Sequence, residues 1–260
     1  MEDLIKKHGL ADLTDKILAA SRPCLEGITS DESVTLCGTK VGGNPHVPVG
    51  FQWPFFKEFP LEFVAQINCA EFTYPNFPNK GLLLFFQDNQ HWGYSPKDAG
   101  FIRVIYYPDV MELQEIPTPV IYRKRLWGIF GHQALPRVYK EAKLVLRQGI
   151  SLPSIERGLI ALSDEGTEDA YCEVKEELQE GRFVQIGGFP NPVQNDGMEA
   201  EIAQMTSRGS AEDWIMILEV YCDKKTDMMW GDAGRLHFFC HIDDLKNQDF
   251  SRCWMQMQCG

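Results

Sequence analysis

The sequence lacks the long apolar stretches that a membrane protein needs. No apolar run in its 260 residues approaches the roughly 20 residues that span a bilayer. Residues 1–7 carry charged side chains where a signal peptide needs an apolar core. We therefore expect a cytoplasmic protein that does not associate with a membrane.

Basic residues are also scarce relative to acidic ones. Lys and Arg number 25 against 37 Asp and Glu, which gives a net charge of −12. Non-specific binding to nucleic acid or to an anionic membrane requires a basic face. The one compact basic cluster, at residues 123–125, is typical of a solvated strand face. The composition therefore argues against nucleic acid as a partner and favours a basic one.

Several common functional motifs are absent as well. The eight cysteines form no Cys-x-x-Cys pair, and several lie inside apolar runs, which indicates reduced, mostly buried thiols. The sequence has no Gly-x-Ser-x-Gly, Gly-x-Gly-x-x-Gly, Gly-Lys-Ser/Thr phosphate loop or His-Glu-x-x-His. We expect no cofactor, and no catalytic residue can be assigned from a motif.

Hydrophobic periodicity predicts a β-rich chain with an N-terminal helix. Residues 2–20 have helical spacing, with Gly9 as a point of division and Pro23 beyond the end, and we expect this helix to cover the rest as a lid. A short helix is predicted at 168–180, another at 198–206, and one turn capped by Asp243. Strands are predicted at residues 33–41, 63–69, 81–87, 101–107, 120–122, 143–146, 214–222, 235–242 and 254–258.

Two Gly/Pro-rich segments interrupt this pattern, at residues 42–54 and 186–197. The first is too rich in proline and glycine for regular structure. Its aromatic residues favour an ordered, packed loop. These residues are Phe51 and Trp53 in the segment and Phe55 and Phe56 directly after it. Such a loop either binds a sugar, peptide or protein or plugs the end of a sheet, and we favour the plug.

The sequence indicates an internal duplication. Residues 61–88 align without a gap on residues 214–241 with six identities in 28 positions. Both segments read as strand, polar loop, glycine and aromatic strand, and a Gly-Gly-x-Pro loop precedes each. We therefore predict one α+β domain over residues 1–260, with a first half at about 33–110 and a second at about 183–259. A pseudo-twofold axis would relate the halves, and a cleft between them is the default ligand site.

Three ordered signatures resemble those of the YwqG-like family, a domain family of unknown function (DUF1963). The first comprises Gly-Gly-x-Pro at 42–45, Trp53-Pro54, a strand with Gln66, and residues 78–86. The second lies at residues 186–196, and the third runs from Trp230 to Trp254. The resemblance implies a compact β-rich α+β domain of soluble bacterial proteins. It implies no established activity, cofactor or catalytic residue, and His237 departs from its usual pattern.

His237, His241 and Asp243 are the nearest approach to a metal-binding pattern. On a strand the two histidines share a face but lie roughly 13 Å apart, too far to bind one ion without a bend. We therefore expect surface or core-edge histidines and no metal site.

Polar and aromatic residues of the loops are the better candidates for a ligand site. The set comprises Gln66, Gln194, Asp196, Trp230, Asp232, Arg235 and Trp53. Asp196 and Asp232 follow Gly-rich turns that would converge between the halves, where paired carboxylates can act as acid and base. Asp near Gly is also an ordinary turn residue, and we favour that interpretation.

These observations favour a non-enzymatic binding protein that recognises a basic protein or a small ligand. An antitoxin or immunity-type role is one version. The alternative is a hydrolase-type enzyme that uses Asp196 and Asp232 in the cleft.

Overall fold

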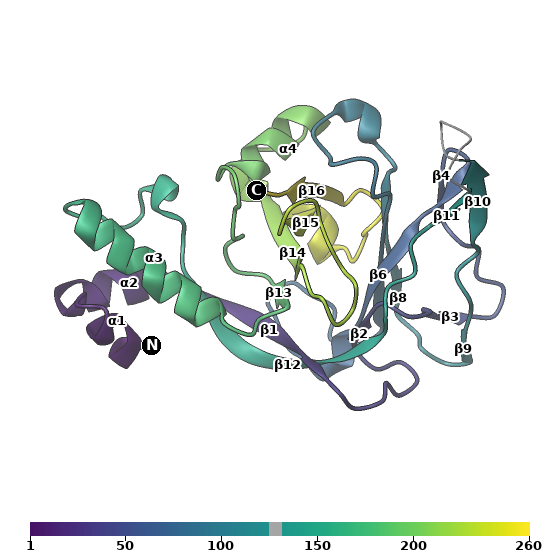
Figure 1. Cartoon of the computed structure of the whole chain (residues 1–260), viewed down its shortest axis with the longest axis horizontal. Coiled ribbons are helices and arrows are strands. Elements are labelled where there is room, and N and C mark those ends of the chain that lie inside the picture. Colours follow the sequence, from purple (N-terminus) through teal and green to yellow (C-terminus); the bar gives the residue numbers. More distant parts are fainter. Residues whose placement is uncertain (125–131) are drawn as a thin grey trace.

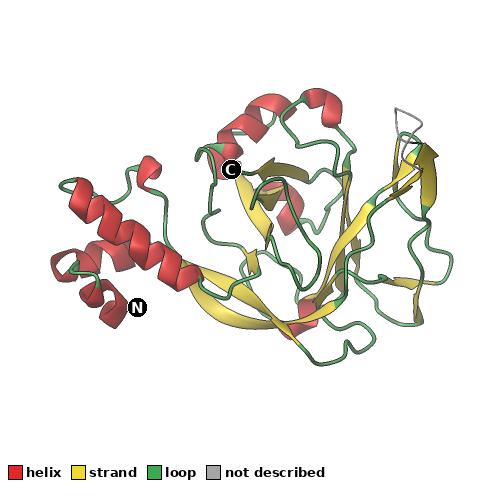
Figure 2. Ribbon diagram, in the orientation of Figure 1, coloured by secondary structure: helices red, strands yellow, loops and turns green. Residues whose placement is uncertain are grey.

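Ten strands build one large antiparallel sheet, which dominates the computed structural model (Figures 1 and 2). The structure describes residues 1–124 and 132–260. In spatial order the strands are β16 (Trp254–Gln258), β15 (Arg235–His241), β14 (Trp214–Tyr221), β13 (Val184–Ile186), β1 (Arg22–Ser30), β12 (Ala142–Ser151), β2 (Lys40–Val41), β6 (Glu62–Asn68), β7 (Leu82–Gln87) and β8 (Ile102–Tyr107). Long β1 and β12 pair at the middle of this order, with four strands on either side.

The remaining elements are short or lie at the ends of the sheet. Three two-stranded ribbons pair β3 (His46–Pro48) with β9 (Leu113–Glu115), β4 (Phe55–Phe56) with β5 (Phe59–Pro60), and β10 (Ile121–Lys124) with β11 (His132–Leu135). The α-helices are α1 (Glu2–Lys7), α2 (Thr14–Ala20), α3 (Glu165–Gln179), α4 (Met198–Thr206) and α5 (Ile242–Lys246). Short 3₁₀ turns are η1 (Ala11–Leu13), η2 (Cys69–Glu71), η3 (Pro96–Asp98), η4 (Ile155–Arg157) and η5 (Ala211–Asp213). None of the helices in the described ranges has the length and apolar character needed to cross a membrane.

The sheet curves until its two edge strands nearly meet. The loop after β7 bridges the gap, because the Trp254 indole N–H donates to the Gly93 carbonyl at 2.9 Å and the Met257 N–H donates to the Trp92 carbonyl at 3.0 Å. Gly93 has φ +81°, and a Cβ there would lie 1.8 Å from the Met255 carbonyl oxygen. Only glycine fits this close approach.

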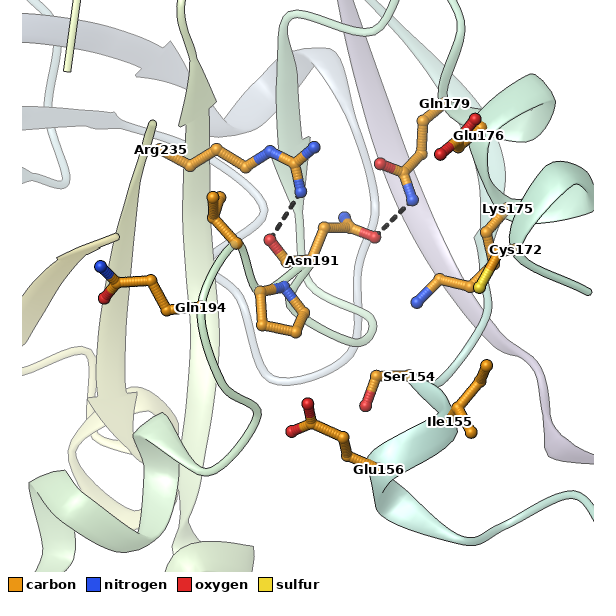
Figure 3. A pocket seen from close by; sticks show the side chains of 12 residues that line it. Ser154, Ile155, Glu156, Cys172, Lys175, Glu176, Gln179, Asn191, Gln194 and Arg235 are labelled. Carbon is orange, nitrogen blue, oxygen red and sulfur yellow. Dashed lines mark hydrogen bonds between the residues drawn. The ribbon is translucent and has the colours of Figure 1, made fainter. Parts of the chain in front are cut away.

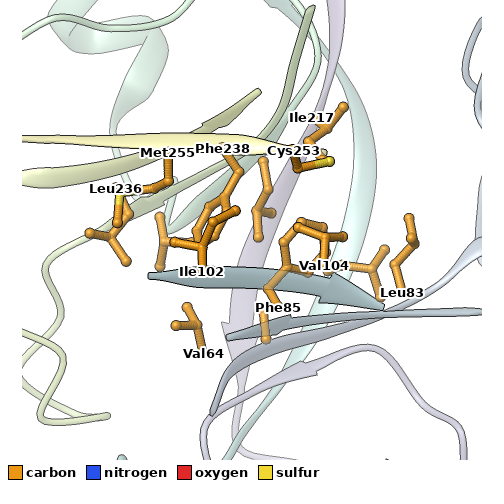
Figure 4. Packing of buried hydrophobic residues seen from close by; sticks show 14 of the residues in the cluster. Val64, Leu83, Phe85, Ile102, Val104, Ile217, Leu236, Phe238, Cys253 and Met255 are labelled. Atoms are coloured by element: carbon orange, nitrogen blue, oxygen red, sulfur yellow. The ribbon is translucent and has the colours of Figure 1, made fainter. Parts of the chain in front are cut away.

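The main core fills the inside of the curved sheet. Figure 4 shows side chains of β7 and β8 meeting those of β14, β15 and the Cys253–Met255 region. Every residue of β7 is buried, as expected for a continuous apolar run that is covered on both faces. The predicted β-rich α+β domain with an N-terminal helix is confirmed.

Two hairpins on opposite sides of this core have the same pairing register. In β6–β7, Gln66 pairs with Leu84, and in β14–β15, Glu219 pairs with His237. Each hairpin also has one irregularity, between Phe63 and Ala65 in the first and at the corresponding 216–218 step in the second. Adding 153 to each residue number of the first hairpin gives its counterpart in the second.

A second, smaller core joins the N-terminal helices to α3. Its buried residues include Ile5, Ile17, Leu152, Tyr171 and Val174. This helical group lies beside one end of β1 and β12, away from the main body of the sheet (Figure 1). The prediction that the N-terminal helix covers the rest as a lid is therefore wrong.

Several local predictions need correction. The expected division of the helix at 2–20 is the exception and is confirmed, because Gly9 adopts φ +77° between α1 and η1. A strand at 33–41 was expected, but only Lys40–Val41 is extended, and the long β1 was not predicted. The short helix expected at 168–180 is the 15-residue α3. The turn after β15 is capped by His241 rather than Asp243, since His241 Nδ1 accepts from the Asp243 N–H at 3.3 Å.

Other local predictions are confirmed. Strands form at 62–68, 82–87, 102–107, 214–221, 235–241 and 254–258, and α4 matches its predicted range. All eight cysteines are unpaired, and five of them are buried. In the basic cluster, Arg123 and Lys124 belong to β10, and Arg125 lies outside the described residues.

Candidate functional site

A cavity of about 350 Å³ lies between α3, η4, residues 191–194 and the start of β15 (Figure 3). We call it the α3 cavity. The polar residues in its lining are Ser154, Glu156, Lys175, Glu176, Gln179, Asn191, Gln194 and Arg235. Segments more than 80 residues apart in the sequence therefore meet around one polar space.

Helix α3 presents one face to the cavity. Cys172, Lys175, Glu176 and Gln179 are spaced by three or four residues, which places them on one side of a helix. The other side carries Tyr171 and Val174, which are buried in the smaller core. Asp164 caps the helix by accepting from the Thr167 N–H at 2.9 Å. The packing of the apolar face thus fixes which side chains line the cavity.

The Gly187–Gly188 turn positions the opposite wall. Both glycines have positive φ, +69° and +72°. Gln185 stabilises the turn, since its Nε2 donates to the carbonyls of Gly187 and Phe189 at 2.8 Å each. Asn191 follows two residues later at the cavity wall.

Asn191 is the most extensively bonded residue of this wall. Its Oδ1 accepts from Gln179 Nε2 at 2.6 Å, and its Nδ2 donates to Glu219 Oε2 at 3.0 Å. Its backbone carbonyl accepts from an Arg235 guanidinium N–H at 2.6 Å and contacts His237 Nε2 at 3.3 Å. These bonds link α3, the 191–194 segment, β14 and β15 into one preformed surface.

Two of these partners, Glu219 and His237, are completely buried, each 0% exposed. His237 Nε2 lies 3.3 Å from Glu219 Oε1, and an Arg235 nitrogen lies 3.9 Å from the same oxygen. Within residues 1–124 and 132–260, neither Glu219 Oε1 nor His237 Nδ1 has a hydrogen-bond partner. Buried polar atoms normally have hydrogen-bond partners, so the burial of Glu219 and His237 is unfavourable to the stability of the sheet.

Lys175 is the least engaged side chain of the lining. It makes no hydrogen bond or ion pair with any residue that the structure describes, and its amine points into the cavity (Figure 3). Burial lowers the pKa of the Lys175 ammonium, and the nearby carboxylates of Asp196 and Glu219 partly oppose this shift. The cavity therefore contains an amine that no carboxylate of the described residues contacts directly.

Of the residues predicted from the sequence, Gln194 and Arg235 line the α3 cavity. Asp196 lines an adjacent cavity of about 480 Å³. Its carboxylate accepts from Arg157 Nε at 2.6 Å and from the Ser154 hydroxyl, so it is held in an ion pair. Asp232 is exposed on the turn before β15, and it lines neither of these cavities.

The other predicted residues lie elsewhere. Gln66 is buried in the first hairpin, where it bonds to the Gly38 carbonyl and the His46 N–H, at 2.9 Å each. Trp53 packs on Phe86, and its indole N–H donates to the Leu61 carbonyl at 2.9 Å. In the same way, the indole of Trp230 is buried and donates to the Tyr221 carbonyl at 3.1 Å. The structure thus does not gather the seven predicted residues into one site.

Lys175, Gln179, Asn191 and Glu219 were not predicted from the sequence, and His237 was considered only as a metal ligand. A signal was present for two of them. Glu219 and His237 interrupt strongly apolar strands, and a charged residue inside such a run calls for a functional explanation. The described part of the chain contains no cluster of three or more metal-capable side chains.

Comparison with known proteins gives a family but no activity. A search of curated proteins finds no match to this chain. A family model described as a domain of unknown function, DUF1963, matches residues 39–259. This range contains both hairpins and every residue of the α3 cavity. The match covers most of the chain, which therefore belongs to the DUF1963 family, as its three sequence signatures indicate.

Proposed function

We propose that the protein is a non-enzymatic binding protein and that the α3 cavity takes a small ligand. The observation that carries this proposal is the preformed wall around Asn191, which faces an unengaged Lys175. Preformed polar walls reduce the ordering cost of binding. A volume of about 350 Å³ is also within the usual range for small-molecule sites.

The Asn191 wall of the proposed ligand site belongs to one of two related halves. The equal register of the β6–β7 and β14–β15 hairpins supports a duplication. The two Gly-Gly-x-Pro loops support it further. Lys40 Nζ donates to the Asn44 carbonyl at 2.5 Å, as Gln185 Nε2 does to the Phe189 carbonyl. In both loops, the residue two positions before the first glycine donates a side-chain hydrogen bond to the backbone carbonyl of the x residue.

A basic protein partner is a second candidate, consistent with the net charge of −12. The exposed side of α3 favours it, since Glu165, Asp169, Glu173, Glu176 and Glu177 are acidic residues of one helix that carry exposed or partly exposed side chains. An immunity-type role would use this face. It predicts salt-sensitive capture of a basic protein that is weakened when these residues are neutralised.

The hydrolase alternative has less structural support. It needs Asp196 and Asp232 as a pair in one closed pocket. Asp196 is instead engaged by Arg157, and Asp232 is exposed on a separate turn. If the protein hydrolysed a substrate and this activity required both carboxylates, the hydrolase alternative would be established and the binding proposal contradicted.

A cavity-filling variant tests the binding proposal. Val193 lines the α3 cavity, and Val193→Trp is expected to fill it while the fold is retained. Thermal-shift screening of a small-metabolite library should find compounds that stabilise the wild type and not this variant. Val49→Trp, at a highly exposed position of the first half, is the matched control. Compounds that stabilise all three proteins equally would contradict the proposal.

A further inference from the structure

We infer that the α3 cavity recognises an oxyanion, a carboxylate or phosphate group of a small ligand, through Lys175 and Arg235. This inference rests on the proposed function and adds the chemical class of the ligand. The shared chemistry of the two groups is a compact negative charge with several acceptor oxygens.

The two cations of the cavity are incompletely paired. Lys175 has no hydrogen bond or ion pair among the residues that the structure describes. Arg235 donates to the Asn191 carbonyl, and the carboxylate oxygen nearest to it, of Glu219, is 3.9 Å away. Two cations that line one cavity repel each other unless an anion lies between or beside them. A ligand oxyanion would supply an anion in direct contact with Lys175, which Asp196 and Glu219 influence only from a distance.

The acidic residues of the same cavity do not pair with Lys175. Glu176 is exposed on α3, and Glu156 accepts from the Asp196 N–H at 2.7 Å. In Figure 3 the Glu156 carboxylate lies at the η4 side, on the far side of Ser154 from Lys175. Neither carboxylate forms an ion pair with Lys175 in the described chain.

The two hairpins differ in the residues at three equivalent positions. Because their registers coincide, Arg235 occupies the position of Leu82 and His237 that of Leu84. Glu219 likewise occupies the position of Gln66. The first hairpin shows that this geometry forms with uncharged residues at all three positions. Buried polar and charged groups are unfavourable to folding unless they are fully paired, so the placement of Arg235, Glu219 and His237 beneath the α3 cavity is better explained by ligand recognition than by the needs of the sheet.

The guanidinium of Arg235 has a fixed orientation. Its guanidinium lies 4.5 Å from the Tyr221 ring centroid, and the Tyr221 hydroxyl accepts from Asn191 Nδ2 and donates to Gln179 Oε1. This stacking and the Asn191 bond fix the guanidinium at the cavity wall. A planar, fixed guanidinium is well suited to bind a carboxylate or phosphate.

The test uses paired charged and neutral probes at constant ionic strength. Succinate is compared with succinamide, and glycerol phosphate with glycerol, by thermal shift and calorimetry on the wild type. We expect one charged probe to bind and its neutral analogue not to bind. The phosphate and carboxylate arms decide which oxyanion is preferred.

Three variants then assign the binding to the cavity. Lys175→Met should lower the affinity for the charged probe by at least about tenfold, because it removes a charge-assisted contact. Lys175→Arg should retain binding. Arg235→Leu introduces the residue of the first hairpin and should weaken binding in the same direction. Lys175 makes no bonds that the fold needs, so Lys175→Met remains decisive if Arg235→Leu does not fold.

Equal binding of charged and neutral probes, no binding of either charged probe, or unchanged affinity in Lys175→Met would overturn the inference. A neutral compound that Val193→Trp excludes and Lys175→Met retains would overturn the oxyanion inference alone and leave the binding proposal in place. A charged probe that still binds Val193→Trp at full affinity would overturn both.

Discussion

Phe85 and Phe238 meet edge to face at the centre of the main core, with ring centroids 5.3 Å apart and planes at 73° (Figure 4). They occupy equivalent positions of the β6–β7 and β14–β15 hairpins, paired with Ala65 and Leu218 respectively. The two hairpins therefore contact each other through their matching residues. This packing leaves apolar contact, rather than a polar cleft, at the point where the hairpins face each other.

Truncation of this pair should be strongly destabilising and non-additive. Phe85→Ala and Phe238→Ala should each lower the free energy of unfolding by about 3–5 kcal/mol, since both rings are buried. The double variant should lose about 1 kcal/mol less than the sum, because the ring–ring contact is lost only once. Urea unfolding measures each value, with Phe55→Ala at an exposed aromatic as the control. Strict additivity would show that the two rings are energetically independent.

Exchange of equivalent residues between the hairpins should be tolerated in the second hairpin and destabilising in the first. Glu219→Gln with His237→Leu gives the second hairpin the uncharged pair of the first. We expect the free energy of unfolding to remain constant or rise by about 1 kcal/mol, because buried charged groups often contribute less than uncharged replacements of similar size. The amide introduced by Glu219→Gln would still offer Asn191 an acceptor oxygen, and Arg235 would still bond the Asn191 carbonyl.

The reverse exchange is the matched control for this prediction. Gln66→Glu with Leu84→His buries the same pair in the first hairpin, where Gln66 and Leu84 are fully buried and neither lines the α3 cavity. We expect it to lower the free energy of unfolding by about 3 kcal/mol. Urea unfolding measures both exchanges. Equal destabilisation by the two would mean that Glu219 and His237 serve the fold, and it would weaken the argument from hairpin comparison.

The strands and the main core were accessible from the sequence, but the candidate site was not. β7 and β15 are apolar runs long enough to identify locally, and their similarity revealed the matching hairpins. β1 was missed because Pro23 and Gly27 are weak strand formers and because its partner β12 lies more than 100 residues away. The α3 cavity depends on the contact between Gln179 and Asn191, which local periodicity does not encode.

Glu62 should make stability depend on pH. Burial raises the pKa of Glu62 to about 7, although hydrogen bonds from the Tyr139 hydroxyl and the Arg137 N–H oppose the shift. The folded pKa is above the unfolded value of about 4.3, so the unfolded chain loses this proton first as pH rises. The stabilising contribution of Glu62 is therefore full below about pH 4 and is lost between about pH 4 and pH 7.

Glu62→Gln should remove this part of the pH dependence. The decrease in free energy of unfolding between pH 4 and pH 8 should be roughly 3 kcal/mol smaller in the variant than in the wild type. Urea unfolding across this range measures the difference, and Glu58→Gln at an exposed position is the control. Parallel pH profiles of Glu62→Gln and the wild type would rule out the shifted titration.

Asp196 and Asp232 should respond differently to substitution, although both follow Gly-rich segments. Asp196 binds Arg157 through both carboxylate oxygens, and its side chain is only 3% exposed. Asp196→Ala should therefore lower the free energy of unfolding by about 3 kcal/mol, because it leaves a largely buried Arg157 with only Glu199 as an ionic partner among the described residues. Asp232→Ala, at an exposed turn, should change it by less than about 0.5 kcal/mol.

Substitutions to Asn at the same two positions distinguish a structural role of Asp196 from a catalytic role. If Asp196 connects the start of α4 to η4, Asp196→Asn should recover part of the lost stability, since its amide oxygen still accepts from Arg157. A catalytic pair would behave otherwise: Asp196→Asn and Asp232→Asn would both abolish hydrolysis of a substrate at unchanged stability. Urea unfolding and a hydrolysis assay with both variants therefore decide between the ion pair and the paired-carboxylate enzyme. We expect substitution of Asp196 to lower the melting temperature and substitution of Asp232 to have no effect on it.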